Sequence, residues 1–273
     1  MATIINEIDI LNEAILNRSF LVDGVVRSIR VNSLNSTSLI TYPLVNNGTI
    51  KHYPQNPLNT SYTTTTIKTI ENYGDINFPL DAIFNPYRQR MWIADAGNQK
   101  VLVINSSDYS FIRSVDNMIL PHALVLNSNN RNVFIKSYVN TTTQKITEVT
   151  STGAVVMEFN FPGVISSTTI SYTNKYLNLI PRQDTIDFDN NLQRLWFISG
   201  SVLYMIDLET KQIIPNDLES ERLYKLSSLS IDSDSGNAFV VISDDINWYV
   251  QQIYKDNNEV LGTAYLEVQP IPY

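Results

Sequence analysis

Residues 90–105 read RMWIADAGNQKVLVIN, two apolar runs separated by a short polar segment. Both runs are rich in β-branched and large apolar residues, which favour strands. The polar segment contains Asp95, Gly97 and Asn98, residue types that are common in tight turns. The stretch therefore predicts a β-hairpin in which Asp95 accepts hydrogen bonds from turn amides and Gly97 supplies a positive φ.

Short apolar runs of this kind recur from residue 18 onward, broken by clusters of Asn, Asp, Ser and Gly. Further examples are GVVRSIRV (24–31), SLITYPL (38–44), NVFIKSYV (132–139), RLWFIS (194–199), SVLYMID (201–207) and NAFVVIS (237–243). The chain has only 9 glycines, so Asn and Asp, which tolerate left-handed backbone, are expected at most of the tight corners. Pattern and composition together predict an all-β protein.

One hairpin pattern is repeated along the chain. FNPYRQRMWI (84–93) aligns without gaps with FDNNLQRLWF (188–197), and Phe, Gln, Arg and Trp coincide. LNSNNRNVFI (126–135) and IDSDSGNAFV (231–240) follow the same scheme. Two of the three steps between these copies are close to one four-stranded blade of about 40 residues, and the middle step is longer. The spacing predicts a β-propeller of five or six four-stranded blades, with an extended loop or extra strand within residues 161–184.

The segment IENYGDINFPLDAIFNPYRQRMWIADAGNQKVLVIN (70–105) resembles one NHL repeat, a propeller blade of that length. In that family a glycine-containing lead and a Phe and Pro precede the innermost strand. A second strand then ends in an Asp-x-Gly-Asn turn, followed by a basic residue and another apolar strand. The corresponding positions here are Gly74, Phe78, Pro79, Asp95, Gly97, Asn98 and Lys100. The resemblance implies a propeller blade whose innermost strand follows Phe78 and Pro79.

The first residues of the chain show a different pattern. Apolar side chains recur at three- and four-residue steps, the spacing of one helix face, at Ile4, Ile5, Ile8, Leu11, Ile15 and Leu16. Residues 1–17 are therefore expected to form a short amphipathic helix that docks on the body or on another subunit, or else an irregular segment. The propeller domain is expected to span residues 18–273. No secretory signal peptide and no membrane span are expected.

Composition excludes several classes of function. A formal net charge of −8 argues against a general nucleic-acid or anionic-membrane binder. The absence of cysteine excludes disulfides, thiolate nucleophiles and cysteine-bound metals. DSDSGN (232–237) contains calcium-ligand residue types, but its glycine and its closing position do not fit a calcium loop, so it is expected to be a turn, as is DFDNN (187–191). Asp244 and Asp245 are expected to be solvated, and no cofactor or metal is expected.

Four residues are candidate binding residues: His122, Arg90, Trp248 and Tyr249. His122 follows Pro121 at the start of an expected innermost strand, where its side chain can approach the mouth of the central channel. Arg90 is the basic residue shared by the two hairpins that match best. Trp248 and Tyr249, together with Tyr62, are aromatic residues that can stack on sugar rings if they are exposed.

The main functional prediction is a non-enzymatic binding or assembly module. The 15 tyrosines and the many asparagines favour adaptable polar contacts. In this respect the chain resembles virion proteins of bacteriophages, such as tail, fibre or capsid-associated proteins, which implies a place in the virion rather than the alternative, the cytoplasm. Its partners would be other proteins, including virion subunits reached through residues 1–17, a further copy of the chain, or a host surface glycan or receptor.

Two alternatives remain open. The layout also resembles streptogramin lyases, propellers that use a histidine with a magnesium ion, and this implies a lyase or hydrolase with an axial pocket near His122. The exposed aromatics expected at Trp248, Tyr249 or Tyr62 would instead suit a carbohydrate-binding propeller. The binding and assembly module is the prediction, so no enzymatic activity is expected.

Overall fold

The computed structural model describes the backbone of residues 2–9, 14–23, 28–32, 37–42, 48–53, 65–163, 185–199, 202–216, 225–232, 234–243, 248–254 and 260–266. For residues 2–23 and some strand ends, the structure describes the backbone alone. The described chain is almost entirely β-strand, with two 3-10 turns at η2 (Pro86–Arg88) and η3 (Ala96–Asn98). The all-β prediction is confirmed.

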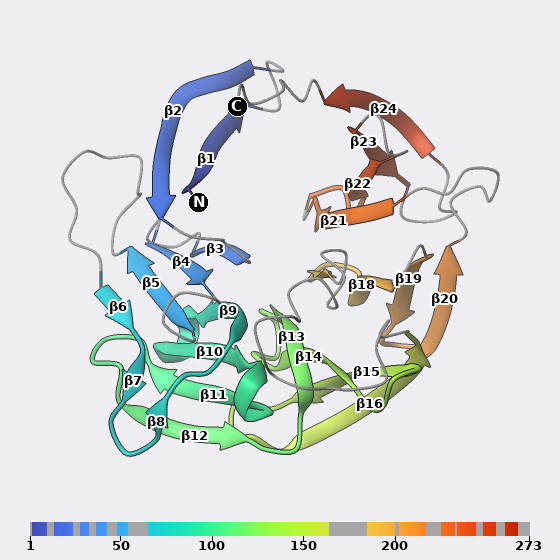
Figure 1. The fold of residues 1–273 in the computed structure, drawn as a ribbon. Helices are drawn as coiled ribbons and strands as arrows, with labels where there is room; N and C mark the ends of the chain where they lie inside the picture. The colour runs from blue at the N-terminus through green and yellow to red at the C-terminus, as the bar shows by residue number, and fades with distance from the viewer. Residues whose placement is uncertain are drawn as a thin grey trace.

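Five four-stranded antiparallel sheets are arranged in a ring as the blades of a β-propeller (Figure 1). The strands of each blade follow one another in chain order, from the centre of the ring to its rim. Blade 1 contains β3 (Ser28–Asn32), β4 (Thr37–Tyr42), β5 (Thr49–Tyr53) and β6 (Thr65–Ile67); blade 2 contains β9 (Pro79–Asn85), β10 (Arg90–Asp95), β11 (Lys100–Asn105) and β12 (Phe111–Val115). Blade 3 contains β13 (Ile119–Leu126), β14 (Val133–Tyr138), β15 (Thr143–Val149) and β16 (Val155–Pro162). Blade 4 contains β17 (Ile186–Asp189), β18 (Arg194–Ser199), β19 (Val202–Asp207) and β20 (Gln212–Asn216); blade 5 contains β21 (Lys225–Ile231), β22 (Ala238–Ser243), β23 (Trp248–Ile253) and β24 (Val260–Leu266).

The hairpins that repeat in the sequence are equivalent in the structure. In all four, the first shared apolar residue pairs with the residue seven positions later: Phe84 with Met91, Leu126 with Val133, Phe188 with Leu195 and Ile231 with Ala238. Each turn also has a left-handed residue at the same place, namely Gln89, Arg131, Gln193 and Gly236. The alignment of the repeats is therefore confirmed. The expectation that Asn and Asp occupy most left-handed corners is wrong, because only two of the non-glycine residues with positive φ in the described part are of these types, Asn72 and Asn117.

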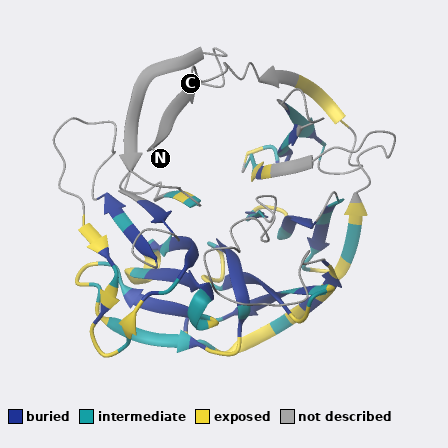
Figure 2. Cartoon of the chain, in the orientation of Figure 1, coloured by how far each residue is buried: buried dark blue, intermediate teal, exposed yellow. Residues whose placement is uncertain are grey.

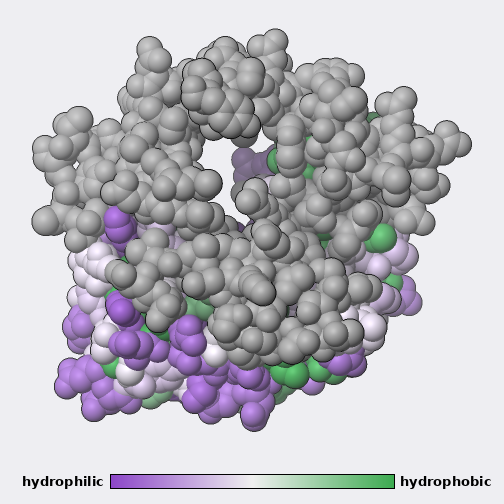
Figure 3. All heavy atoms as spheres, viewed as in Figure 1, coloured by the Kyte–Doolittle hydropathy of each residue, from purple (hydrophilic) through white to green (hydrophobic). Residues whose placement is uncertain are grey.

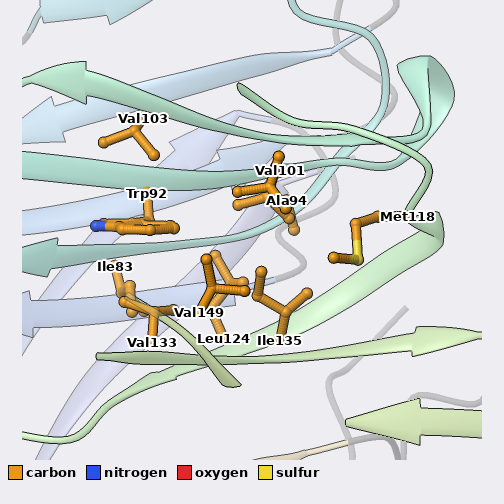
Figure 4. Close-up of a cluster of buried hydrophobic side chains, with 11 residues drawn as sticks. Ile83, Trp92, Ala94, Val101, Val103, Met118, Leu124, Val133, Ile135 and Val149 are labelled. Carbon is orange, nitrogen blue, oxygen red and sulfur yellow. The ribbon is translucent and has the colours of Figure 1, made fainter. Parts of the chain in front are cut away.

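The hydrophobic core lies between neighbouring blades. On β10 and β11 the side chains alternate between two such interfaces. Trp92, Val101 and Val103 pack toward blade 3, in the cluster of Figure 4. Ile93 packs toward blade 1, in a cluster that includes Leu39 and Ile50. Figure 2 shows buried residues concentrated in the inner strands.

The turn between β10 and β11 is built differently from the prediction. Asp95 accepts a hydrogen bond from the Asn77 backbone N–H at 2.7 Å, so it links blade 2 to the segment before β9. In its own turn it accepts a bond from the Asn98 side chain at 2.8 Å and not from a backbone amide. The left-handed residue is Gln99, with φ 55°, and not Gly97. Gly97 is required for close approach, because a Cβ there would lie 2.5 Å from Asn77 Cγ.

The start of the chain forms strands and not a helix. β1 (Ala2–Asp9) pairs antiparallel with β2 (Ala14–Asp23), and in Figure 1 this hairpin lies in the ring between β24 and blade 1. The expectation of a helical or irregular segment over 1–17 is therefore wrong, and residue 17 falls within β2. The isoleucines that produced the helical spacing are β-branched, and with a paired strand available they favour extended backbone.

Other predictions concern individual segments. β6 forms the rim strand of blade 1, and a second short hairpin pairs β7 (Thr69–Ile70) with β8 (Gly74–Asp75). The segment 232–237 joins β21 to β22, as predicted. The turn predicted at DFDNN (187–191) begins later, because residues 187–189 belong to β17 and the chain turns at 190–193. Outside the described residues lie 164–184, Tyr62, Asp244 and Asp245, and the side chain of Trp248.

The rim of the described part is polar on the face that Figure 3 shows. In Figure 3 the rim over blades 2 and 3 is mostly hydrophilic, with scattered apolar residues. No helix among the described residues is long and apolar enough to cross a membrane. The same residues contain no group of three or more His, Asp or Glu side chains that could hold a metal ion.

Candidate protein-interaction face

The turns of each blade alternate between the two ends of the ring axis, because its four strands run antiparallel in chain order. The turns between the first and second strands, and between the third and fourth strands, lie at one end. We call this end the turn face, and the opposite end the linker face. The described turns of the turn face include 86–89, 106–110, 127–132, 150–154, 190–193, 208–211 and 232–237.

Asn and Asp side chains organise these turns from within. Asn127 Oδ1 accepts a hydrogen bond from Asn129 N–H at 3.0 Å, and Asp189 Oδ1 accepts one from Asn191 N–H at 2.8 Å. The same short-range acceptor bond is made by Asn105, Asp207 and Asp232. Asn and Asp are therefore frequent because their side chains satisfy turn amides, while other residues adopt the left-handed φ.

Side chains also link the turns of neighbouring blades. The Ser128 backbone N–H and hydroxyl both donate to Asn190 Oδ1, at 2.7 and 2.6 Å. Asn127 Nδ2 donates to Gln193 Oε1 at 3.1 Å, also between blades 3 and 4. These bonds hold the turns in one arrangement before any partner binds, which lowers the entropic cost of docking.

Four arginines lie on the turn-face side of blades 2 and 3: Arg88, Arg90, Arg113 and Arg131. Arg90 Nη1 donates to the Ser151 carbonyl at 2.5 Å, and Arg113 Nη1 donates to the Thr152 carbonyl. The Arg131 guanidinium lies 5.4 Å from the centroid of the Tyr87 ring, a side chain that is 49% exposed. Within the described part of the chain, none of the four forms an ion pair with a carboxylate.

Burial lowers the pKa of Arg90, and the positive charges of Arg113 and Arg88 lower it further. These arginines therefore repel one another, and each uses few of its five N–H donors inside the protein. An anionic group from outside would relieve the repulsion and occupy the remaining donors. We call the four residues the arginine group.

Of the predicted binding residues, the structure places only Arg90 in this group. His122 lies near the linker-face end of β13 and is 2% exposed. Its Nδ1 is 2.9 Å from the Leu120 carbonyl oxygen, and its ring packs against Tyr138 with centroids 5.2 Å apart. The imidazole is thus a buried packing group and does not line an open channel mouth.

Tyr249, expected as an exposed aromatic, is instead buried at 7% exposure. Its ring packs in the cluster between blades 4 and 5, with Trp196 and Val240. A ring in that position does not offer a face for sugar stacking. Trp248 is the first residue of β23, and its side chain lies outside the description.

The structure shows a charged cluster near the axis that no sequence pattern predicted. Asp81 in β9 is 2% exposed and accepts two bonds from Arg30, Nε to Oδ1 at 3.1 Å and Nη2 to Oδ2 at 2.8 Å. Ser28 Oγ donates to Oδ1 at 2.5 Å, and the Leu124 N–H of blade 3 donates to Oδ2 at 2.9 Å. Burial would raise the pKa of Asp81, but the charge and hydrogen bonds of Arg30 outweigh it and lower the pKa.

Asp187 makes a similar link between blades 4 and 5. Its Oδ2 accepts the Ile231 N–H at 2.8 Å, and its Oδ1 accepts the Phe188 N–H at 2.8 Å. Burial raises the pKa of Asp187 in spite of these bonds and of the charge of Arg30. The signal in the sequence was a single acidic residue within an apolar strand, as in PLDAIF and IDF.

A buried cation links blades 3 and 4. Lys136 in β14 is fully buried, and its Nζ donates to the Ile198 carbonyl at 2.5 Å. The ammonium also lies 5.8 Å from the ring centroids of Phe161 and Phe197. Together with Asp81 and Asp187, it shows that three of the buried charges in this protein connect one blade to the next.

Comparisons with known proteins support the fold. No protein-family model matches the sequence, and no curated protein matches it. Among solved structures, the chain is similar to Kuenenia stuttgartiensis Hydrazine Synthase, with a TM-score of 0.55 and 12% sequence identity over 73% of this chain and 52% of that chain. The chain therefore spans about half the length of that structure. At this identity the likeness shows a β-propeller fold and nothing about activity.

Proposed function

We propose that the protein is a non-enzymatic binding and assembly module that docks another protein on its turn face. The observation that supports this most is the arginine group, four cationic side chains without a carboxylate partner among the described residues of an acidic chain. The linked turns around it provide a rigid frame. The buried charges near the axis are occupied with interblade contacts, which suits a structural role for them better than a catalytic one.

The finer proposal is a component of a bacteriophage virion, such as a tail, fibre or capsid-associated protein. It is supported by the composition, rich in Asn and Tyr, which favours adaptable polar contacts at protein interfaces. In this proposal the segment that begins the chain is the anchor to a neighbouring subunit, and the blade around residues 70–105 is of the NHL type.

The test is whether the arginine group holds the protein in a larger assembly. The full chain, tagged and expressed from its own genome, is sedimented through a density gradient from lysates at moderate ionic strength. The wild-type chain is expected in the fast-sedimenting fractions, and Arg88→Glu is expected to move most of it to the slow fractions. Arg88 is exposed, and its side chain forms no hydrogen bond or ion pair with another described residue, so the substitution should leave the fold intact.

Lys68→Glu makes the same charge change on the linker-face side and serves as the control. It is expected to sediment like the wild type. A wild-type chain found only in slow fractions would overturn the assembly proposal. Equal losses in both variants would overturn the role of the turn face.

The anchor is tested separately by deletion of residues 1–23, which removes the whole β1–β2 hairpin without cutting a strand. Loss of fast sedimentation, with the circular dichroism of the β-propeller retained, is the expected result. Unchanged sedimentation would assign docking to the propeller alone.

A further inference from the structure

The turn face has a second charged region, opposite in sign to the arginine group. Besides the buried Asp189, blades 4 and 5 place four exposed or half-buried carboxylates there: Asp207, Glu209, Asp232 and Asp234. Among the described residues of these turns, the only cations are Arg194 and Lys211, and Arg194 already lies 3.9 Å from Asp207. We call the four carboxylates the acidic group.

The arginine group has almost no such carboxylates beside it. On the turn face of blades 2 and 3 the exposed described acid is Asp108. Glu148, the other acid near these turns, is 2% exposed and accepts hydrogen bonds from Asn130 and Asn132 at 3.1 and 2.7 Å. The described part of the turn face is therefore divided, with positive charge on blades 2 and 3 and negative charge on blades 4 and 5.

This division is self-complementary under one symmetry operation. A two-fold axis parallel to the plane of the ring, lying just outside the turn face and running between blades 3 and 4, brings two copies together turn face to turn face. The operation reverses the order of blades, so blade 3 lies on blade 4 of the other copy and blade 2 lies on blade 5. Each arginine group then faces an acidic group, and each contact occurs twice, as in any isologous dimer.

Apolar side chains on the same face support burial against a partner. Tyr87 of blade 2 is 49% exposed and Leu192 of blade 4 is 39% exposed, although both lie at the tips of turns. In the two-fold arrangement, Tyr87 comes opposite blade 5 and Leu192 comes opposite blade 3. An exposed Tyr beside an Arg, as Tyr87 lies beside Arg131, is typical of interface centres.

We infer that the protein docked on the turn face is a second copy of this chain, paired through the two-fold axis between blades 3 and 4. The inference rests on the proposed function and names its partner. Charge complementarity selects this partner. A chain of net charge −8 would repel most other acidic surfaces, but in the two-fold arrangement the acidic group of one copy lies opposite the arginine group of the other.

The test measures molar mass in solution by light scattering and sedimentation, over a range of protein and salt concentrations. At low ionic strength the wild type is expected at twice 31.0 kDa, and about 1 M salt, with a Debye length of about 3 Å, is expected to shift it to the monomer. Arg88→Glu with Arg131→Glu, and separately Glu209→Arg with Asp234→Arg, are each expected to weaken the dimer about 100-fold, because each reversed charge acts twice.

Mixing the two double variants is the decisive step. In the mixed dimer every reversed group faces another reversed group of opposite sign, and the native groups also face each other. The mixture is therefore expected to regain the dimer, which neither variant forms alone, and this recovery also shows that both variants are folded. Lys68→Glu, on the linker-face side, is expected to leave the dimer unchanged.

Three results would overturn the inference: a monomeric wild type at every concentration, a dimer insensitive to both double variants, or folded double variants that remain monomers when mixed. A monomeric wild type whose fast sedimentation is still lost in Arg88→Glu would reject self-pairing and retain the proposed function. A charge-dependent dimer that joins no larger assembly would retain self-pairing and reject the virion assignment.

Discussion

At the scale of single residues, Asp95 shows how burial changes a side chain's chemistry. The carboxylate is fully buried and accepts hydrogen bonds from Asn77 N–H, from Tyr73 OH at 2.9 Å and from Asn98 Nδ2 at 2.8 Å. Burial nevertheless raises its pKa from 3.8 to about 6. The folded protein therefore binds a proton at Asp95 in a pH range where the unfolded chain has released it.

Asp95→Asn is expected to remove this proton uptake. In the wild type, the stability supplied by the raised pKa is fully present below pH 3.8 and is lost as pH rises through about 6, a loss on the order of 2–3 kcal/mol. The free energy of unfolding, measured with urea at pH 4, 5, 6 and 7, should fall less steeply with pH in the variant. Parallel profiles for the two proteins would contradict the assignment.

His52 makes the stability of the protein depend on pH in the direction opposite to Asp95. It lies in β5 between blades 1 and 2, 8% exposed, with Nδ1 2.7 Å from Tyr109 OH and its ring 5.4 Å from Phe84. Burial lowers its pKa below 6.5, so the neutral imidazole is favoured in the folded state. Its contribution to stability is present above pH 6.5 and is lost as pH falls through the lowered pKa.

His52→Phe keeps an aromatic ring against Phe84 and removes the titrating group. The variant is expected to lose less stability than the wild type between pH 7 and pH 5, measured by the same urea series. Tyr109 is half-buried, so water can replace the lost hydrogen bond of its hydroxyl. If the variant loses as much stability between pH 7 and pH 5 as the wild type, a group other than His52 causes the pH dependence of stability in this range.

At the scale of the hairpin element, Gly97 is the residue on which the turn between β10 and β11 depends. Gly97→Ala would place a Cβ 2.8 Å from the Asn77 carbonyl oxygen, a backbone atom that cannot move aside easily. The expected destabilisation is about 1–3 kcal/mol. Gly262→Ala is the control, because nothing lies within 4 Å of a Cβ at that strand position, and it should change the free energy of unfolding by less than about 1 kcal/mol.

A loss in Gly97→Ala no larger than that in Gly262→Ala would contradict the close approach. The comparison also separates crowding from backbone freedom, since neither glycine has a positive φ. Thermal or urea unfolding of the two variants at one pH is sufficient.

The same element shows what could be predicted from the sequence. The repeat Phe-x-x-x-x-Gln-Arg-x-Trp identified the hairpins, because period-two alternation and turn residues are local features that act within a few residues. The close approach at Gly97 and the role of Asp95 were missed, because both depend on contacts with Asn77, well outside the hairpin. The partners of Asp81 and of the arginine group come from other blades, so no local pattern could place them. The β1–β2 hairpin was missed because isoleucine spacing alone does not separate a helix face from a strand.

At the scale of the whole molecule, Arg30 connects three blades. From blade 1 it binds Asp81 of blade 2 and donates to the Leu124 carbonyl of blade 3 at 3.3 Å. Asp81 in turn accepts the Leu124 N–H, so the three inner strands share one network. The ion pair is asymmetric in exposure, with side chains 33% and 3% exposed.

Arg30→Met is expected to destabilise the protein at pH 7 by about 2–3 kcal/mol, somewhat less than for a pair buried on both sides. The loss arises mainly because Asp81 is left charged and buried. Adding Asp81→Asn should therefore recover part of it, and a double-mutant cycle in urea measures the recovery. Additive losses from the two substitutions would show that the pair is not coupled.

The described sheets have one further property: each blade is built from a single continuous stretch of chain, in order around the ring. Contacts within a blade are therefore close in sequence, a topology that permits early and rapid formation. A nascent chain that has emerged to residue 163 already contains every residue of the clusters between blades 1 and 2 and between blades 2 and 3. During synthesis the ring would consequently grow one sector at a time, and half of its interblade core could be assembled before blade 4 leaves the ribosome.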